Sequence, residues 1–134
     1  MIELEISKIK IDESRSEQLI VLKEKEGNRF LPLVIGISEV QSIKMKLSGI
    51  VPPRPLTHDL LCQTLEALGA KIVRITIDGL QNNTFYAKLA VQSKDGNPIE
   101  VDARPSDCVA LASRTQAPIF ITEEVLGQAG VTSL

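Results

Sequence analysis

The fold is decided by residues 73–91, which read VRITIDGLQNNTFYAKLAV. Apolar side chains stand at alternate positions over 73–77 and again over 85–91, with polar side chains between them. Alternation with a period of two is typical of strands that bury one face. The segment 78–83 is rich in turn-forming residues, so this stretch predicts two half-buried strands joined by a turn.

Three more strands are predicted on the N-terminal side of this stretch. The aliphatic positions of the first strand change phase near Ser7 and Lys8, which predicts one long strand with a bulge. Apolar runs at 19–22 and 30–35 flank a short polar segment and predict a hairpin. Within that segment the Gly27-Asn28 pair is expected to adopt the positive φ of a tight turn.

Two helices are predicted next, separated by an extended connection. A capping box that starts at Ser38 opens the first helix, and Gly49 ends it. Residues 50–56 contain three prolines and must be extended. Thr57 is placed to cap a second helix over 58–68. The predicted apolar faces carry Val40, Ile43 and Leu47 in the first helix, and Leu61, Leu65 and Leu68 in the second.

The C-terminal third predicts a further hairpin, a helix, a short strand and a short helix. Asp95-Gly96 is a hairpin signal and leads into a strand that places Asp102 on its less apolar face. A third helix follows Arg104, a short strand covers 118–121, and a fourth helix starts near Thr122. Hairpins outnumber βαβ units in this order, which favours an α+β domain with a largely antiparallel or mixed sheet and about four helices.

Length and composition limit the classes of protein. The chain has 134 residues, enough for one domain over 1–134, and its 43% hydrophobic content can build a core without disulfides or metals. The tail from about residue 127 is expected to fray. No apolar run is long enough for a membrane span, and the start lacks the pattern of a signal peptide, so we expect a cytoplasmic protein without a membrane partner.

Charge and aromatic content argue against tight binding of long nucleic acid. The formal net charge is −2, no Lys/Arg run is present, and only one Tyr and three Phe occur. Proteins that track a phosphate backbone are typically basic, and those that bind single strands offer aromatic platforms. The two cysteines, Cys62 and Cys108, lie in helical patterns without a CxxC motif, which favours small buried hydrophobes over a redox pair or metal ligands.

Two similar segments carry the residues in which chemistry could occur. Each places an Arg-Pro pair before a helix and an acid in the first turn of that helix: Arg54-Pro55-Leu56-Thr57-His58-Asp59 and Arg104-Pro105-Ser106-Asp107. One interpretation is helix capping alone. The other is that both helix starts meet at one pocket, where free amides, Arg54, Arg104 and the hydroxyls of Thr57 and Ser106 hold a phosphate.

The acids and the histidine of these segments allow a hydrolytic interpretation. If Asp59, Asp102 and Asp107 converge, their oxygens could hold a divalent cation, most simply Mg²⁺. His58 is the single histidine and lies in the first turn of a predicted helix, where it is available as a base. A capping or surface histidine is the alternative, and the generic nucleotide-loop, nucleophile-elbow and zincin motifs are absent.

At these same residues the chain resembles the bifunctional nuclease domain family of bacteria and plants. The resemblance rests on several separated motifs in the right order: 52–61 PPRPLTHDLL, 65–70 LEALGA, 84–87 TFYA, 101–107 VDARPSD, 31–36 LPLVIG and 117–119 API. It implies an α+β fold, nuclease action on DNA and RNA with the support of a divalent metal, and a homo-oligomer, with a dimer favoured.

Two hypotheses therefore stand. In the first, Asp59, Asp102 and Asp107 hold a metal, His58 assists proton transfer, and the two arginines bind the phosphate of a weakly bound DNA or RNA substrate. In the second, the same Arg and Asp side chains satisfy one another, and the chain is a non-catalytic homo-oligomeric module that binds a ligand or a partner.

Overall fold

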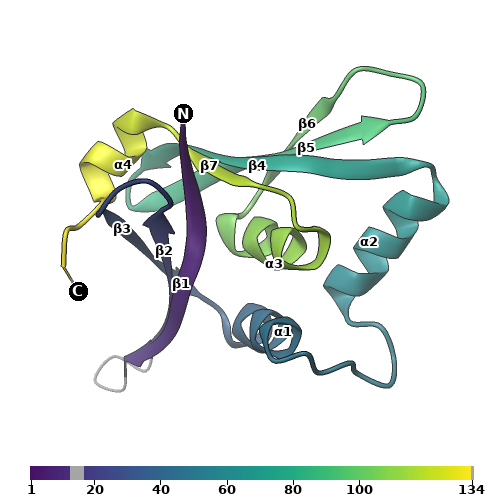
Figure 1. Ribbon diagram of the computed structural model, residues 1–134, viewed down its shortest axis with the longest axis horizontal. Coiled ribbons are helices and arrows are strands. Elements are labelled where there is room, and N and C mark those ends of the chain that lie inside the picture. The colour runs from purple at the N-terminus through teal and green to yellow at the C-terminus, as the bar shows by residue number, and fades with distance from the viewer. Residues whose placement is uncertain (13–16, 134) are drawn as a thin grey trace.

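The computed structural model describes residues 1–12 and 17–133, which form a seven-stranded sheet covered by helices (Figure 1). The strands are β1 (Ile2–Asp12), β2 (Glu17–Glu24), β3 (Phe30–Ile35), β4 (Ala70–Gln81), β5 (Thr84–Ser93), β6 (Ile99–Ala103) and β7 (Ile119–Ile121). The helices are α1 (Ile37–Leu47), α2 (Thr57–Ala67), α3 (Pro105–Thr115) and α4 (Glu123–Ala129). Strand order is β3-β2-β1-β7-β4-β5-β6, and β4 and β7 form the one parallel pair in this part of the chain. The predicted α+β class with a mixed sheet is confirmed.

The hairpin of β4 and β5 is the one predicted from residues 73–91. Ile75 pairs with Leu89 and Ile77 with Ala87, so the apolar sets of both strands share one face. The turn consists of Asn82 and Asn83, at φ values of 52° and 63°. Positive φ at both central residues is the backbone of a type I′ turn, whose twist matches that of the strands it joins.

The prediction of positive φ at Gly27 and Asn28 is wrong, although the hairpin of β2 and β3 exists. Its turn, residues 25–29, is long enough to reverse the chain without a left-handed pair. The turn is closed instead by the Glu24 carboxylate, which accepts hydrogen bonds from the Arg29 backbone N–H at 3.0 Å and from its Nε at 2.8 Å. The predicted bulge in β1 is confirmed, because the register with β2 shifts between Ile6 and Lys8.

Both predicted N-caps are displaced. Gly36 rather than Ser38 caps α1, since the Val40 N–H already donates to the Gly36 carbonyl. Strand β3 ends at residue 35, so the helix begins at once and Ser38 lies inside it. Leu56 rather than Thr57 is the N-cap of α2, where its backbone N–H donates to the Asp59 carboxylate at 3.0 Å.

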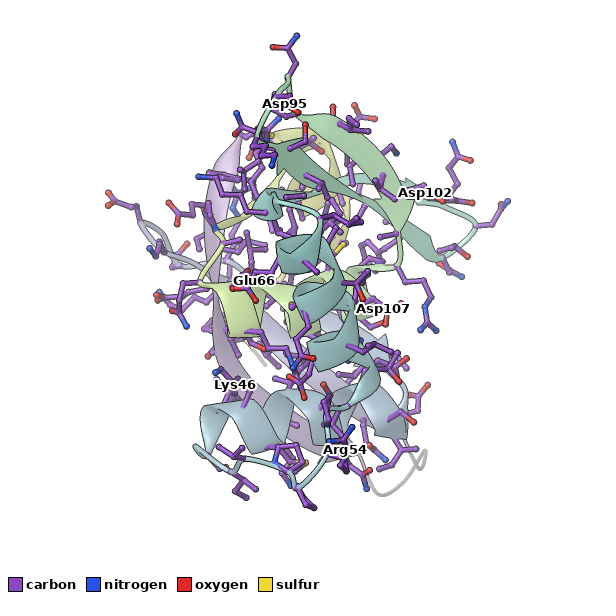
Figure 2. The ribbon with its side chains drawn as sticks, turned by 90° about the vertical axis from the view of Figure 1, so that its right-hand side faces the viewer. Lys46, Arg54, Glu66, Asp95, Asp102 and Asp107 are labelled. Carbon is purple, nitrogen blue, oxygen red and sulfur yellow. The ribbon has the colours of Figure 1, made fainter. Side chains whose placement is uncertain are left out.

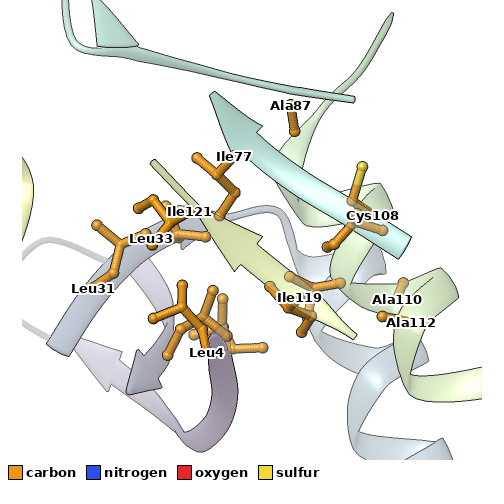
Figure 3. Packing of buried hydrophobic residues seen from close by; sticks show 14 of the residues in the cluster. Leu4, Leu31, Leu33, Ile77, Ala87, Cys108, Ala110, Ala112, Ile119 and Ile121 are labelled. Carbon is orange, nitrogen blue, oxygen red and sulfur yellow. The ribbon is translucent and has the colours of Figure 1, made fainter. Parts of the chain in front are cut away.

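The core lies between the sheet and α3. The buried face of α3 packs against β4 and β5, while α1 and α2 flank it on the outside. Figure 3 shows Ile119 and Ile121 of β7 among side chains from the N-terminal strands, with Ile77 and Cys108 close by. The Cys108 side chain is fully buried, as predicted for a small hydrophobe, and Cys62 is partly buried.

The predicted apolar face of α2 is only partly used. Leu65 packs against the core, but Leu61 is 41% exposed and Leu68 is 72% exposed. Leu47 at the end of α1, also predicted to face inward, is 56% exposed. Helical spacing alone does not say how far neighbouring elements cover a face, and α2 lies at the outer edge of the helical layer (Figure 1).

The C-terminal residues pack against the rest of the domain. The Thr122 hydroxyl caps α4 by accepting from the Val125 N–H, and Leu126 is fully buried. Beyond the helix, Val131 exchanges two backbone hydrogen bonds with Phe30. In the described part of the chain, no helix has the length and apolar character needed to cross a membrane.

Candidate functional site

The two Arg-Pro segments meet in the folded protein. The first opens α2 and the second opens α3, and these helices pack side by side. His58, in the first turn of α2, points its Nε2 at the Oδ1 of Asp107, in the first turn of α3, at 3.0 Å. Segments about fifty residues apart in sequence are therefore joined by one histidine–carboxylate contact.

This contact belongs to a chain of five polar side chains. Asp107 Oδ2 accepts from Arg104 Nε at 2.8 Å, and the Nη2 of Arg104 donates to Glu39 Oε1 at 2.9 Å. At the other end, Ser42 Oγ lies 2.9 Å from His58 Nδ1. We call Ser42, His58, Asp107, Arg104 and Glu39 the polar network. It connects α1, α2 and α3 through hydrogen bonds to charged groups, which are stronger than those between neutral groups.

Exposure changes along the polar network. Ser42 is 3% exposed and Glu39 is 8% exposed, whereas the Arg104 side chain is 68% exposed. The His58 side chain, at 12%, and the Asp107 side chain, at 31%, lie between these limits. A solute can therefore reach the guanidinium of Arg104 and the carboxylate of Asp107, but it cannot reach the Ser42 hydroxyl, so Ser42 is excluded as a nucleophile.

Both ring nitrogens of His58 are engaged. If Nε2 carries the proton, it donates to Asp107, and Nδ1 accepts from the Ser42 hydroxyl. In this arrangement Asp107 orients the ring and would stabilise the imidazolium that forms when the ring accepts a proton. His58 can exchange a proton with a substrate only after one of its two partners is displaced.

The electrostatics hold Asp107 in its ionised form. Burial by itself raises the pKa of Asp107, but hydrogen bonds from Arg104 and His58 outweigh it and keep the pKa below its ordinary value. The same pairing raises the pKa of Arg104, chiefly through its hydrogen bond with Asp107. An ionised carboxylate beside an exposed guanidinium is the resting state of the network near neutral pH.

Asp59 is engaged separately from the polar network. Its Oδ1 accepts from the Nε of Arg114 at 2.6 Å, and its Oδ2 accepts from the Leu56 N–H. Burial raises the pKa of Asp59, but these two hydrogen bonds lower it by more than burial raises it. The pKa of Asp59 therefore lies below its ordinary value. Arg114 belongs to the last turn of α3, and its side chain is only 7% exposed.

The other predicted site residues lie apart from the polar network. Arg54 and Thr57 are exposed at the start of α2, and Arg54 forms no ion pair with the described side chains of residues 1–10 and 17–133. Asp102 is exposed on β6, paired in register with Lys88 of β5. Figure 2 shows Arg54, Asp107 and Asp102 spread along one side of the molecule. Ser106 is partly buried beside Arg104.

The predicted cation ligands do not form a common cluster. Among the described side chains, those of residues 1–10 and 17–133, no group of three or more His, Cys, Asp or Glu is placed to hold a metal ion. The Asp59 carboxylate is bonded to Arg114, and the Asp107 carboxylate is bonded to Arg104 and His58. The third predicted ligand, Asp102, lies on β6. In this arrangement these side chains do not fit a shared divalent cation.

The two Arg-Pro segments line two different hollows. Arg104, Pro105 and Ser106 border a hollow of about 380 Å³ together with β3 and the β4–β5 turn. Pro52, Pro53, Pro55, Leu56 and Asp59 border another hollow of about 380 Å³, which also contains Arg114. The expectation of one shared pocket is not met, although the polar network joins the two segments.

Sequence reasoning missed three side chains that complete these contacts. Glu39 and Ser42 lie on α1, and Arg114 lies at the far end of α3 from its Arg-Pro segment. Glu39 was interpreted as part of a capping box, and Arg114 is a typical cation for the last turn of a helix. No local pattern distinguishes a polar residue that faces another helix from one that faces water.

The sequence is similar to that of one known domain family and to several individual proteins. A family profile described as the bifunctional nuclease domain matches residues 20–133. An uncharacterised protein of Mycobacterium tuberculosis is 43% identical over 129 residues, which cover 96% of this chain and 76% of that protein. "Bifunctional nuclease 1" of Oryza sativa subsp. japonica is 28% identical over 122 residues, covering 87% of this chain and 36% of that protein. "Bifunctional nuclease 1" of Arabidopsis thaliana is 27% identical over 109 residues, covering 78% and 33%. The chain thus spans about a third of the length of these plant relatives.

Proposed function

The chain belongs to the bifunctional nuclease domain family, and from that premise we propose that it hydrolyses phosphodiester bonds in DNA and RNA. The observation that carries the proposal is the contact between the two family segments. The Nε2 of His58 lies 3.0 Å from the Oδ1 of Asp107, and Asp107 also accepts a hydrogen bond from Arg104, whose side chain is 68% exposed. A proton-accepting pair next to an exposed guanidinium is a combination that phosphodiester hydrolysis can use.

Each group has a role in this proposal. Arg104 binds the phosphate, aided by Ser106 in the hollow at the start of α3, where backbone N–H groups also favour an anion. Binding of the phosphate to Arg104 draws the Arg104–Asp107 pair away from His58 Nε2. The ring then holds its proton on Nδ1, where it donates to the Ser42 hydroxyl oxygen, and Nε2 takes a proton from the attacking water. The water oxygen bonds to phosphorus as the bond from phosphorus to the leaving ester oxygen breaks, and the leaving oxygen takes its proton from solvent. Weak binding of the polymer agrees with the net charge of −2.

The test is cleavage of end-labelled single-stranded RNA and DNA by the purified protein. We expect Arg104→Gln, His58→Gln and Asp107→Asn each to lower the rate by at least about a hundredfold, the size typical for a lost acid–base group or charge stabiliser. Asp95→Asn is the matched control, since Asp95 lies in the β5–β6 turn, far from Asp107 (Figure 2). Cleavage that persists unchanged in all three site variants would refute the proposal.

Metal support stays a prediction, and the same assay tests it. An EDTA arm and a Mg²⁺ titration show whether cleavage needs a divalent cation. Asp102→Asn and Asp59→Asn then distinguish the predicted ligands from Asp107. Loss of cleavage in EDTA with full activity of both variants would mean that a cation acts without these two carboxylates.

A second function is favoured by the complete pairing of the site. Asp59, Asp107 and Glu39 each accept from an arginine, as a purely structural network would require. On this view the chain is a non-catalytic homo-oligomer, and the outward leucines of α2 contact a second copy: Leu60, Leu61 and Leu68. Sedimentation of wild type and Leu61→Gln tests this. A wild-type monomer would exclude it, and a dimer lost in Leu61→Gln without any cleavage activity would favour it.

A further inference from the structure

The hollow beside the proline-rich connection is separate from the polar network. It has a volume of about 380 Å³ and lies between the end of α1, residues 50–56, the first half of α2 and Arg114 of α3. Figure 2 shows Lys46 and Arg54 at the end of the molecule where α2 begins. His58, Asp107 and Arg104, the residues with a role in the proposed hydrolysis, do not line it.

Most of the wall of this hollow is apolar and stiff. Seven of its lining residues are Met45, Ile50, Val51, Pro52, Pro53, Pro55 and Leu56. Ile50 is 55% exposed and Val51 is 87% exposed, so apolar surface is left in contact with water. The prolines fix the backbone φ of this wall, which reduces the conformational entropy that a bound molecule would have to remove. Apolar surface with these properties suits the body of a small molecule.

Arg114 lines this hollow and its guanidinium keeps capacity for further hydrogen bonds. Its side chain is 7% exposed, and its Nε donates to Asp59. Nη1 donates to the Ala110 carbonyl at 3.1 Å and Nη2 to the Ser42 carbonyl at 3.5 Å. A guanidinium carries five N–H groups, so two remain without a partner in these contacts. Each guanidinium nitrogen thus has one partner, and the second N–H groups of Nη1 and Nη2 leave capacity for an acceptor that enters the hollow.

The charges that line the hollow favour an anion. Lys46 and Arg114 contribute two positive charges, whereas Asp59 contributes one negative charge. Both carboxylate oxygens of Asp59 are already bonded, to Arg114 and to the Leu56 N–H. Lys46 is exposed at the rim and forms no ion pair with the side chains that the structure describes, those of residues 1–10 and 17–133. The uncompensated charge of the site is therefore positive.

We propose that this hollow is a binding site for a small organic anion. The apolar body of the ligand packs against residues 50–56, and its carboxylate or phosphate group contacts Lys46 and the free donors of Arg114. A phosphate monoester with a flat base and a carboxylate on an aliphatic chain share this chemistry, and the two are distinguished by experiment.

Cys62 provides the readout, because it lines the hollow and is partly exposed, while Cys108 is fully buried. Alkylation of Cys62 by iodoacetamide is followed by mass spectrometry in the absence and presence of adenosine monophosphate, octanoate or neutral adenosine. We expect at least one of the two anions to slow alkylation several-fold and adenosine to have little effect. The anion that protects identifies phosphate or carboxylate as the preferred group.

A matched pair of lysine variants tests the contact with the anion. Lys46→Gln should weaken protection roughly threefold to tenfold, the range for one ionic hydrogen bond at a partly exposed site. Lys44→Gln, also in the last turn of α1 but outside the hollow, should match wild type. The proposal is overturned if neither anion protects Cys62 at millimolar concentration, if adenosine protects as well as adenosine monophosphate, or if the two lysine variants behave alike.

Discussion

At the scale of single residues, the arginine that the sequence motif highlights, Arg54, forms fewer contacts in the structure than Arg114, which lies outside any motif. Arg54 stands in a conspicuous motif, yet it is exposed and forms no ion pair with the side chains described for residues 1–10 and 17–133. Arg114 stands in no motif, yet its side chain is 7% exposed and joins α3 to Asp59 of α2 and to the Ser42 carbonyl of α1. Removal of a buried donor leaves its acceptors unpaired in a medium poor in water.

We therefore expect Arg114→Gln to lower the free energy of unfolding by about 1–3 kcal/mol, the cost of unpaired buried polar groups. Arg54→Gln should change it by less than about 0.5 kcal/mol, as is usual for an exposed position without contacts. Urea denaturation monitored by circular dichroism measures both. Equal effects of the two substitutions would contradict the assignment of Arg114 as the structural arginine.

At the scale of elements, the length of a turn decides which asparagine adopts the left-handed backbone conformation. Asn83 has φ of 63° in the two-residue turn between β4 and β5, whereas Asn28 lies in a longer turn and has no positive φ. An L-residue with a branched Cβ is strained in the left-handed region, and asparagine tolerates it. The sequence pattern Gly-Asn pointed to the wrong hairpin because loop length, not composition alone, selects the turn type.

Asn83→Val should consequently lower the free energy of unfolding by about 1–2 kcal/mol, the cost of a left-handed conformation for a residue with a Cβ. Asn28→Val is the control, because Asn28 is also exposed but lacks the positive φ, and its effect should be clearly smaller. Thermal and urea unfolding of the two variants give the comparison. A larger loss in Asn28→Val than in Asn83→Val would mean that the left-handed pair is not at the β4–β5 turn.

At the scale of the whole molecule, the helical layer is held together by ion pairs whose acids titrate. The pKa values of Asp59 and Asp107 both lie below the ordinary value in the folded protein. An acid whose pKa is lower in the folded state than in the unfolded state stabilises the fold at any pH above its unfolded pKa of about 3.9. That contribution is lost as the pH falls through the folded pKa, because protonation then breaks the pairs with Arg114, Arg104 and His58.

The free energy of unfolding should thus be steady between pH 7 and pH 5 as far as these two acids are concerned, and fall below about pH 4. The double variant Asp59→Asn, Asp107→Asn should be less stable at pH 7 but lose less stability between pH 5 and pH 3. Asp95→Asn should keep the wild-type slope. Urea titrations at each pH measure this, and parallel slopes for wild type and the double variant would show that the two acids do not link stability to pH.

The features of residues 1–12 and 17–133 divide into those that local sequence determined and those that required the folded chain. Alternation, turn residues and proline content determined the strands, the β1 bulge and the extended connection, because these depend on neighbours within a few positions. The segments that carry the family resemblance were also visible in the sequence. Helix starts were displaced by one or two residues, since a cap signal competes with where the preceding strand ends.

The site was decided by tertiary structure. That His58 contacts Asp107, that Asp59 is taken by Arg114 and that Asp102 stays on β6 all depend on how α1, α2 and α3 pack against the sheet. The same holds for the exposed leucines of α2 and for the hollow beside the prolines. The sequence gives the chemistry of each side chain. The partner of a charged side chain depends on the distances between segments in the folded chain, and no local sequence pattern determines those distances.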